Sequence, residues 1–453
     1  MSPPMTRTIT VVGAGMAGLV AAVQAQERGA QVTLVEKGDA PGGSLAMSGG
    51  TLWCAQSVDD LRRLVPRGDP VLGRVLVEEY PAGVQWLQQL GAILTLLPSL
   101  PDRLVYLMEP TPRAFVEFMH RRFLAHGGCL LTNSPGVRLC MNEAGAVNGL
   151  VIRGADGKQK SIPADAVILT TGGFQGNPDL TARYFGRWAD RLVLRATPHS
   201  TGDGLLMGQA IGAATSRAMS SFYGHLIPAP PAMVPTHDFI AYTHYHSEQA
   251  ILVNRQGERF TDESLGDETK CQAVARQTEA VAFILYDDVV YRTFAVRVTG
   301  GGARASDTFY ESQALGAPAA QAQTLGELAV ALESFGVYGP GLLATIQEFN
   351  AAVGVGRAGQ LRIPRRAKAN PLITPPFYAL GLTPGITFTL GGLRINATAQ
   401  VLDSSNRPIP GLYAAGADAG GIHNEQYAGG LCLGLVFGRI AAQQAVAQGA
   451  VNG

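Results

Sequence analysis

The sequence predicts an α/β protein built on a parallel β-sheet, and three consecutive stretches near its start support this prediction. Residues 8–12 (TITVV) are β-branched and apolar, which is typical of a buried parallel strand. Residues 16–29 space their apolar side chains as a helix does and end at Gly29, a candidate C-cap. Residues 31–36 (QVTLVE) predict a second strand, so the three stretches form a βαβ unit.

The turn between the first strand and the helix has the glycine spacing of a dinucleotide-binding loop. Its six residues are Gly13, Ala14, Gly15, Met16, Ala17 and Gly18. In such a loop the first glycine makes the tight turn, the second lets the backbone approach a pyrophosphate, and the third lets the helix pack on the strand. The N–H groups and dipole of the helix favour the diphosphate, and Glu36 can accept from the adenosine ribose. The pattern therefore predicts a Rossmann-type domain.

The rest of the sequence divides into two domains that differ in their sequence patterns. Further stretches typical of helices or strands are 112–127, 164–171, 203–213, GGLRIN, GLYAAG and a last helix from 431 to 448. Residues 219–371 carry aromatics and prolines but no dinucleotide motif, so we expect an inserted second domain there. The first domain is then discontinuous, with residues 1–218 and 372–453 as its two parts.

Additional glycine-rich segments favour FAD over NAD. Gly42-Gly43-Ser44 and Ser48-Gly49-Gly50 follow the second strand. A second glycine loop at this place resembles flavoproteins in which the backbone runs alongside the isoalloxazine. Residues 170–173 (TTGG) and 411–418 (GLYAAGAD) each end a further strand, in agreement with such a site.

Together these segments resemble the flavoprotein superfamily of fumarate reductase, succinate dehydrogenase and 3-ketosteroid Δ1-dehydrogenase. The resemblance covers nearly the whole chain and rests on GAGMAG, PGGSLAMSGG, TTGGF, STGDG, NRQGERFTDE, TLGG, PGLYAAGAD and GGLCLGLVFGRIA, in that order. It implies an α/β protein with a discontinuous Rossmann-type FAD-binding domain and an inserted α+β capping domain. Relatives with covalent flavin use a histidine of the second glycine loop. Residues 40–50 contain none, so we expect non-covalent FAD.

The resemblance also implies which residues contact the cofactor, with Asp418 at a ribityl hydroxyl. Beyond the first glycine loop, the expected contacts are Glu36, Lys37, Gly42, Gly43, Ser44, Ser48, Gly49, Gly50, Thr171, Gly172, Gly173, Asp203, Gly416, Asp418, Leu431 and Leu433.

The cationic residues that hold a dicarboxylate in fumarate reductases are replaced in this chain. By the resemblance, Thr387-Phe388 stands in place of a histidine, Tyr427 in place of a carboxylate-binding arginine, and Gly266-Asp267 in place of the proton-donating arginine. Without these cations a dianion would be desolvated and unpaired, which is costly. The replacements argue against C4-dicarboxylate reduction.

Tyr427 instead suggests chemistry beside a ketone, because ketosteroid Δ1-dehydrogenases have a tyrosine at the matching place. Its O–H and a backbone N–H of Gly430 or Leu431 would form an oxyanion-hole-type pair for the carbonyl oxygen. His423 and Glu425, close by in the sequence, either tune this tyrosine or belong to a surface loop.

The resemblance implies a second tyrosine, in the capping domain, as the base that removes the α-proton. The candidates are Tyr242 and Tyr245 in the segment AYTHYH. If that segment is a strand, Tyr242 shares a face with His244 and His246, and Tyr245 takes the other face. Tyr223 and Tyr106 are weaker candidates.

These residues predict an FAD-dependent dehydrogenase that introduces a C=C bond α,β to a ring ketone, with an external electron acceptor. Two alternatives remain: an ene-reductase or dehydrogenase of a carboxylic acid, and an electron-carrying subunit without a substrate of its own. The balanced charge, 35 basic against 35 acidic residues, argues against nucleic-acid binding. The five scattered cysteines suggest reduced thiols in the cytoplasm. We expect neither a metal site nor a transmembrane segment.

Overall fold

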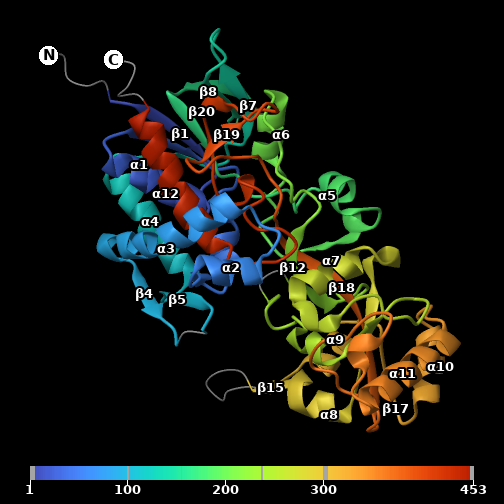
Figure 1. The fold of residues 1–453 in the computed structure, drawn as a ribbon. Helices are drawn as coiled ribbons and strands as arrows, with labels where there is room; N and C mark the ends of the chain where they lie inside the picture. The colour runs from blue at the N-terminus through green and yellow to red at the C-terminus, as the bar shows by residue number, and fades with distance from the viewer. Residues whose placement is uncertain (1–5, 99–100, 155, 236–237, 299–304, 449–453) are drawn as a thin grey trace. The chain divides into compact units, whose positions relative to one another are not determined.

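The computed structural model describes residues 6–98, 101–154, 156–235, 238–298 and 305–448. The chain divides into two compact units, whose elements are labelled in Figure 1. The first unit contains the chain up to Leu180, Ala196–Phe222, and the chain from Phe388 onward. The second unit contains Thr181–Arg195 and Tyr223–Thr387.

The first unit is built on a six-stranded sheet. Its strands in spatial order are β19 (Gln400–Leu402), β20 (Pro408–Ala414), β10 (Ala166–Leu169), β1 (Thr8–Val12), β2 (Gln31–Val35) and β6 (Cys129–Leu131). All neighbours pair in parallel except β19 and β20. The chain leaves β1 for β2 on one side and later returns to β10 on the other, so the strand order reverses at β1. Parallel sheets bind nucleotides at the carboxyl ends of the strands beside such a reversal.

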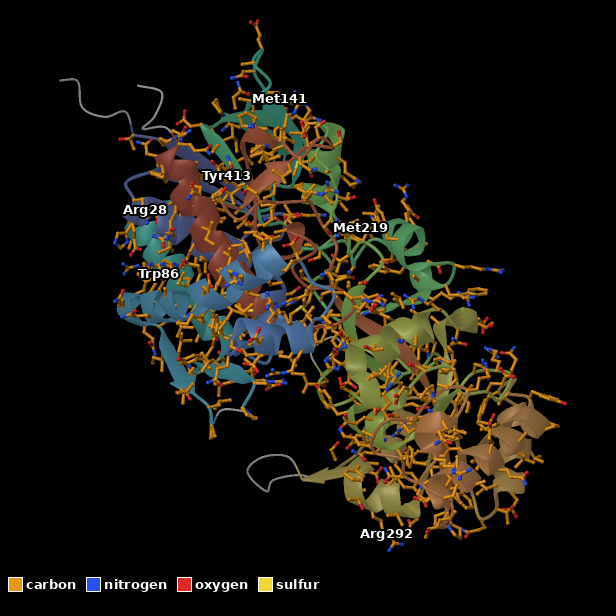
Figure 2. All side chains as sticks on the ribbon, in the orientation of Figure 1. Arg28, Trp86, Met141, Met219, Arg292 and Tyr413 are labelled. Atoms are coloured by element: carbon orange, nitrogen blue, oxygen red, sulfur yellow. The ribbon has the colours of Figure 1, made fainter. Side chains whose placement is uncertain are left out.

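Two helices from opposite ends of the sequence pack together in this unit (Figure 1). The helices here are α1 (Met16–Glu27), α2 (Val58–Leu64), α3 (Pro70–Leu90), α4 (Pro112–Ala125), α6 (Asp203–Ala210) and α12 (Leu431–Ala447). The first ten residues of α1 are all buried. Helix α12 approaches α1 closely because it presents glycine: a Cβ on Gly438 would lie 2.8 Å from the carbonyl oxygen of Ala17. Trp86 of α3, labelled in Figure 2, donates a hydrogen bond of 2.7 Å to Glu27 at the end of α1.

Two small antiparallel sheets complete the first unit. They consist of β3 (Thr51–Ala55), β5 (Arg103–Glu109) and β4 (Ile93–Leu96), and of β7 (Gly136–Met141), β8 (Val147–Arg153) and β9 (Gln159–Pro163). Helix α5 (Pro178–Phe185) carries the chain across the boundary between the units. No helix in the described part of the chain has both the length and the apolar character needed to cross a bilayer.

The second unit is organised around one long strand, β18 (Phe377–Thr389). The strands that pair with it or extend its sheet are β11 (Val193–Leu194), β12 (Phe222–Pro228), β13 (Ile251–Val253), β14 (Ala282–Asp287) and β17 (Ala319–Ala322). A separate hairpin pairs β15 (Val296–Val298) with β16 (Ala305–Asp307). The helices are α7 (Asp267–Ala275), α8 (Asp288–Val290), α9 (Thr308–Ala314), α10 (Leu325–Glu333) and α11 (Gly339–Gly354). The sheet and helices α10 and α11 share an apolar core that includes Phe283, Leu328 and Phe349.

A buried group of charges lies inside the second unit. The carboxylate of Glu263, which is fully buried, pairs with Arg259 at 2.6 Å and with Arg365 at 2.8 Å. Arg365 also donates to the carbonyl oxygens of Ala250 and Glu248. One carboxylate thus joins three segments of this unit.

The predicted βαβ unit is confirmed by β1, α1 and β2, and the Rossmann-type fold class by the parallel sheet. Residues 241–246 do not meet the condition considered for them, that of a strand: the Thr243 hydroxyl donates to the carbonyl oxygen of Phe239, and a 3₁₀ turn follows at Tyr245–Gln249. One local expectation, a regular element at GGLRIN, is wrong. The GGLRIN segment makes only isolated bridges.

The bounds of the second unit differ from the expected 219–371. Strand β18 pairs with β14 and β17, which places residues up to Thr387 in this unit. Strand β11 pairs with β18 as well, which brings in Thr181–Arg195.

Candidate functional site

The glycine turn after β1 leaves room for a ligand at one position only. Gly13 has a φ of +105°, and a Cβ there would lie 2.3 Å from the carbonyl oxygen of Thr170. A Cβ on Gly18 would lie 1.7 Å from the carbonyl oxygen of Gly13. At Gly15, by contrast, a Cβ would meet no protein atom closer than the Gly42 carbonyl oxygen, 4.0 Å away. The first and third glycines are therefore required by the protein itself, and the second faces open space.

The N-terminus of α1 has the features of an anion-binding site. Gly15 is the N-cap, no side chain caps the helix, and the first turn contains no acidic residue. Its N–H groups and the positive end of the helix dipole are thus available to a diphosphate.

Glu36 closes the turn from the end of β2. Its carboxylate is buried and accepts from the N–H of Ala14 at 2.8 Å and from the N–H of Gly38 at 2.7 Å. Each carboxylate oxygen can accept a further hydrogen bond. The ribose contact expected of Glu36 stays a prediction.

The second glycine loop packs against the first. The N–H of Gly42 donates to the carbonyl oxygen of Ala14 at 2.8 Å. Gly42 and Gly43 both have positive φ, at +128° and +48°. Ser44 accepts from the N–H of Thr197 at 3.3 Å. Ser48 accepts from the N–H of Gly50 at 3.2 Å, which shapes the GG turn that holds Gly49.

A polar cluster connects β10, α6 and the turn after β20. Asp418 accepts from both the N–H and the hydroxyl of Thr171, and that hydroxyl accepts from the N–H of Gly204. Burial raises the pKa of Asp418 to about 7, although the Thr171 hydrogen bonds oppose the shift. At the start of α6, Asp203 pairs with Lys37 at 3.0 Å.

The remaining cofactor candidates also lie in the first unit, next to the ends of parallel strands or at the start of α12. Gly172 and Gly173 follow β10, Gly416 follows β20, and Leu431 and Leu433 are in the first turn of α12. The open Gly15, the uncapped helix and these clustered strand ends fit a dinucleotide with a diphosphate.

Tyr427 stands among aromatic rings of the first unit. Its ring centroid lies 5.5 Å from that of Trp53, 5.6 Å from Phe388 and 5.9 Å from His423. Its hydroxyl accepts from the N–H of Gly430 at 2.9 Å. This corrects the expected donor pair, since the Gly430 N–H binds the tyrosine oxygen itself. The N–H of Leu431, at the start of α12, is the other expected partner.

His423 and Glu425 differ although only one residue separates them. His423 is buried, and its two ring nitrogens have no hydrogen-bond partner among the described residues. Burial lowers its pKa to about 3, so the ring beside Tyr427 is neutral. Glu425 has a φ of +61° and pairs with Arg67 at 2.5 Å in an exposed loop.

The tyrosines considered as the base have different surroundings. Tyr242 is half-buried in the turn before Tyr245. Tyr245 is 37% exposed, and its ring lies 5.1 Å from that of His225. Tyr106, in β5 of the first unit, packs 6.5 Å from Tyr80.

Tyr223 belongs to a hydrogen-bonded chain that the sequence did not reveal. Its hydroxyl lies 2.8 Å from Nε2 of His225, whose Nδ1 lies 3.0 Å from a carboxylate oxygen of Asp267. The other oxygen of Asp267 lies 3.1 Å from Nζ of Lys270. The only local signal is the Tyr-x-His spacing, which puts both side chains on one face of a strand. Asp267 is 42 residues further on.

Burial and nearby charges fix the protonation states of His225 and Asp267. Burial alone would raise the pKa of Asp267, but the hydrogen bond from His225 and the charge of Lys270 prevail and lower it to about 2. Burial lowers the pKa of His225, and Arg195 and Lys270 lower it further, against the opposing effect of Asp267. At neutral pH Asp267 is therefore an ionised carboxylate and His225 a neutral imidazole.

Arg195 is a second feature that the sequence did not reveal. Its side chain crosses β18 at Gly385, where a Cβ would lie 2.4 Å from Cδ of the arginine. Nη1 donates to Thr387 at 3.1 Å, and the guanidinium lies 5.7 Å from the ring of Phe239. Nε is buried and has no partner among the described residues. A cation therefore stands beside Thr387, where a cationic residue was expected to be missing.

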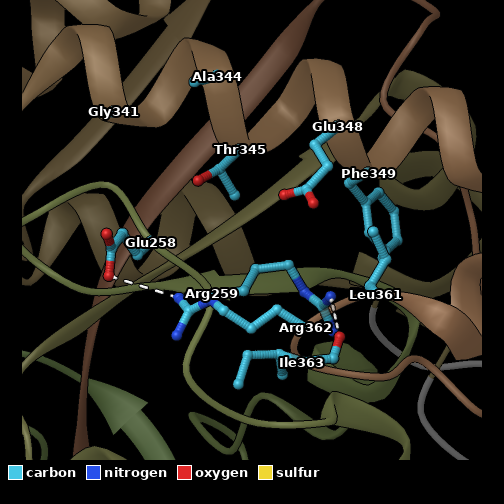
Figure 3. A pocket seen from close by; sticks show the side chains of 10 residues that line it. All are labelled: Glu258, Arg259, Gly341, Ala344, Thr345, Glu348, Phe349, Leu361, Arg362 and Ile363. Carbon is cyan, nitrogen blue, oxygen red and sulfur yellow. Dashed lines mark hydrogen bonds and ion pairs between the residues drawn. The ribbon is translucent and has the colours of Figure 1, made fainter.

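A cavity of about 250 Å³ in the second unit is lined by other residues (Figure 3). They are Glu258, Arg259, Gly341, Ala344, Thr345, Glu348, Phe349, Leu361, Arg362 and Ile363. None of the candidate site residues contributes to it. Within the described ranges, no group of three or more His, Cys, Asp or Glu side chains is arranged to hold a metal ion.

Comparisons with known proteins agree with this geometry. A family model described as FAD binding domain matches residues 8–433. The chain is 28% identical, over 98% of its length and 78% of the relative's, to a fumarate reductase (cytochrome) of Shewanella frigidimarina. It is 26% identical, over 98% of its length and 94% of the relative's, to 4-oxocyclohexanecarboxylate 2-dehydrogenase of Sinomonas cyclohexanicum.

Among solved structures, a 3-ketosteroid Δ1-dehydrogenase from Sterolibacterium denitrificans has the same fold. It superposes with a TM-score of 0.77 at 20% identity and covers 98% of this chain and all of that one. The expected superfamily and FAD as cofactor are thereby confirmed, whereas non-covalent attachment stays a prediction.

Proposed function

We propose a reaction for this chain on the premise that it belongs to the FAD binding domain family and is an FAD-dependent oxidoreductase of the fumarate reductase type. The proposed reaction introduces a C=C bond α,β to the carbonyl of a ring ketone. FAD, when bound, supplies the two-electron redox chemistry. The protein must polarise the ketone oxygen and remove the α-proton.

The main support for a ketone substrate is the uncharged surroundings of Tyr427. Trp53, Phe388 and the neutral His423 offer an apolar surface and no charge to a ligand beside the tyrosine. Two arginines near this group already have anionic partners: Arg103 over Trp53 pairs with Asp102, and Arg67 pairs with Glu425. Such a site suits a neutral carbonyl better than a dianion.

Tyr427 is the proposed hydrogen-bond donor to the ketone. The Gly430 N–H donates to its oxygen, and chained hydrogen bonds polarise one another, which strengthens the phenol as a donor. The Leu431 N–H at the helix start is the second proposed donor. The α-proton goes to a tyrosine of the second unit, for which Tyr242 and Tyr245 were the expected candidates.

A second candidate function is oxidation or reduction of a carboxylic acid, and Arg195 favours it. No carboxylate lies within ion-pair distance of its guanidinium among the described residues, and an arginine is well suited to a planar carboxylate. The name of the Shewanella relative points the same way. The oxo acid in the name of the Sinomonas relative carries both a ketone and a carboxylate, so it is a suitable probe for either function.

The test is anaerobic bleaching of the flavin by a panel containing a 3-oxosteroid, 4-oxocyclohexanecarboxylate and succinate, with fumarate tested as an oxidant of the reduced enzyme. We expect ketones to bleach the flavin and both C4 acids to be inert. Tyr427→Phe should lower the rate by about 10²–10³-fold, the usual cost of one oxyanion-hole donor, and retain FAD. Tyr338→Phe, at an exposed tyrosine, is the matched control.

Two results would overturn the ketone proposal. One is turnover of fumarate or succinate at ordinary enzyme rates. The other is a wild-type rate for Tyr427→Phe on a ketone that bleaches the flavin. Arg195→Gln separates the two functions: it should raise the KM of the oxo acid by about tenfold or more and leave that of a steroid unchanged, because hydrogen bonds to charged groups are worth roughly 1.5–3 kcal/mol.

A further inference from the structure

We infer that Tyr223, rather than Tyr242 or Tyr245, transfers the substrate proton, and that His225 and Asp267 form the relay that makes this tyrosine a base. This inference rests on the proposed function for its substrate. Its geometry comes entirely from the second unit.

The positions of the three side chains follow from the local fold. Tyr223 and His225 are two residues apart in β12, so they share one face of the strand and their polar atoms meet at 2.8 Å. Asp267 is the first residue of α7 and reaches the other side of the imidazole at 3.0 Å. Lys270, one helical turn later, holds the second carboxylate oxygen. The carboxylate therefore has little freedom to turn away from His225.

The hydrogen bonds assign the tautomer of His225. Asp267 is ionised and can only accept, so Nδ1 of His225 carries the hydrogen. In a neutral imidazole Nε2 is then an acceptor, and it receives the hydrogen of the Tyr223 hydroxyl. A base oriented by a carboxylate and hydrogen-bonded to a hydroxyl is the arrangement that activates hydroxyl groups in many enzymes.

The proton balance of the step is complete. The bond from the substrate α-carbon to hydrogen breaks, and that proton forms a new O–H bond on Tyr223. The original hydroxyl proton of Tyr223 moves to Nε2 of His225, and Asp267 stabilises the resulting imidazolium. The electron pair of the broken α-C–H bond forms the new C=C bond as the β-C–H bond breaks, and the β-hydrogen leaves as hydride with the two electrons that FAD would accept in the proposed reaction. In the reductive direction Tyr223 donates a proton to the α-carbon, and His225 returns a proton to Tyr223.

Several other groups face the relay. Arg195, which follows β11, and Lys270 of α7 act on His225 with positive charge, and the ring of Tyr245 packs edge-on against the imidazole. Tyr245 therefore meets this histidine through its ring, whereas Tyr223 meets it through its hydroxyl. The matched control is Tyr338→Phe, at an exposed tyrosine of the same unit.

The experiment measures anaerobic flavin reduction by 4-oxocyclohexanecarboxylate and by a 3-oxosteroid. Tyr223→Phe should lower the rate by about 10²–10⁴-fold, the usual contribution of general acid–base catalysis, with normal FAD content. Tyr338→Phe should keep a rate close to the wild type, and Tyr245→Phe, which retains the ring against His225, should lower the rate less than Tyr223→Phe does. Tyr223→Phe combined with His225→Gln should be no slower than the slower single variant, because residues that act as one unit are not additive.

The pH profile distinguishes a relay from a merely structural role. Asp267→Asn removes the charge that favours imidazolium, so the acid limb of the kcat/KM profile should move to lower pH as the rate falls. An unshifted profile, or a Tyr223→Phe variant as fast as the wild type, would overturn the relay. If only acids react, the ketone proposal fails, but the same variants assayed on the acid still decide on the relay, because that reaction also moves a proton.

Discussion

Asp418 is a buried carboxyl group of the first unit that accepts hydrogen bonds from Thr171 and from the backbone of Gly172. Burial disfavours its ionised form, and the nearby Asp203 adds to the effect. The folded protein therefore binds a proton at Asp418 more tightly than the unfolded chain does. Each unit of difference between the folded and unfolded pKa corresponds to about 1.4 kcal/mol of unfolding free energy.

This shift predicts a pH-dependent stability. Because the folded pKa of about 7 lies above the model value of 3.8, the contribution is present below about pH 4 and is lost as the pH rises through 7. In protein freed of FAD, Asp418→Asn should raise the melting temperature relative to the wild type at pH 8 and have little effect at pH 4. Glu143→Gln, at an exposed carboxylate, is the control. Equal effects of Asp418→Asn at both pH values would contradict the prediction.

At the scale of elements, the glycines of the turn before α1 have two different roles, close packing of the protein and access for a ligand. Gly18 is needed because the helix rests on the turn, whereas Gly15 is open on the protein side. The length and direction of α1 are set by its packing, so the space at Gly15 is available to whatever binds the uncapped helix end.

Gly15→Val should therefore leave the fold intact and remove FAD, because a Cβ there lies no closer than 4.0 Å to the Gly42 carbonyl oxygen, while the side chain occupies the diphosphate approach. FAD content by absorbance and the melting temperature of the purified protein test this. Gly354→Val, at another glycine without close neighbours, should keep its flavin. Flavin retained by Gly15→Val at the wild-type ratio would show that the diphosphate lies elsewhere.

Motif-bearing elements were predictable from the sequence because their chemistry is local. The glycines, Glu36 and the β-branched strands of the βαβ unit lie within 30 residues of one another. The Tyr223–His225–Asp267 chain and Arg195 were not predictable, since their geometry depends on contacts between distant segments. The sequence also left open whether 241–246 is a strand: the structure has a turn there, in which the Thr243 hydroxyl donates to the nearby backbone.

At the scale of the whole molecule, both units have apolar cores, and the second also encloses a buried ionic group. The first is held by apolar packing of α1, α12 and the sheet. The second contains Glu263, buried between Arg259 and Arg365. Removing one member of a buried ionic group leaves the others uncompensated, which typically costs 3–5 kcal/mol.

Glu263→Gln should therefore destabilise the second unit by about 3–5 kcal/mol, because two buried guanidinium groups lose their carboxylate. Hydrogen exchange should show faster opening of β13, β14 and α11, with the amides of β1 and α1 unchanged. Glu348→Gln, whose side chain lines the cavity of Figure 3 and belongs to no ion pair identified among the described residues, is the control. Uniform acceleration in both units would mean that they unfold as one.

The discontinuous first unit also fixes the order in which the protein can be completed during its synthesis. The second unit is fully translated at Thr387, when the first unit still lacks β19, β20 and α12. Until then the apolar surface that α1 presents to α12 stays uncovered, and Asp418 and Tyr427 have not yet been made. A nascent chain therefore lacks the proposed FAD contacts Gly416, Asp418 and Leu431 until after the second unit has been made, so flavin capture would follow the synthesis of that unit.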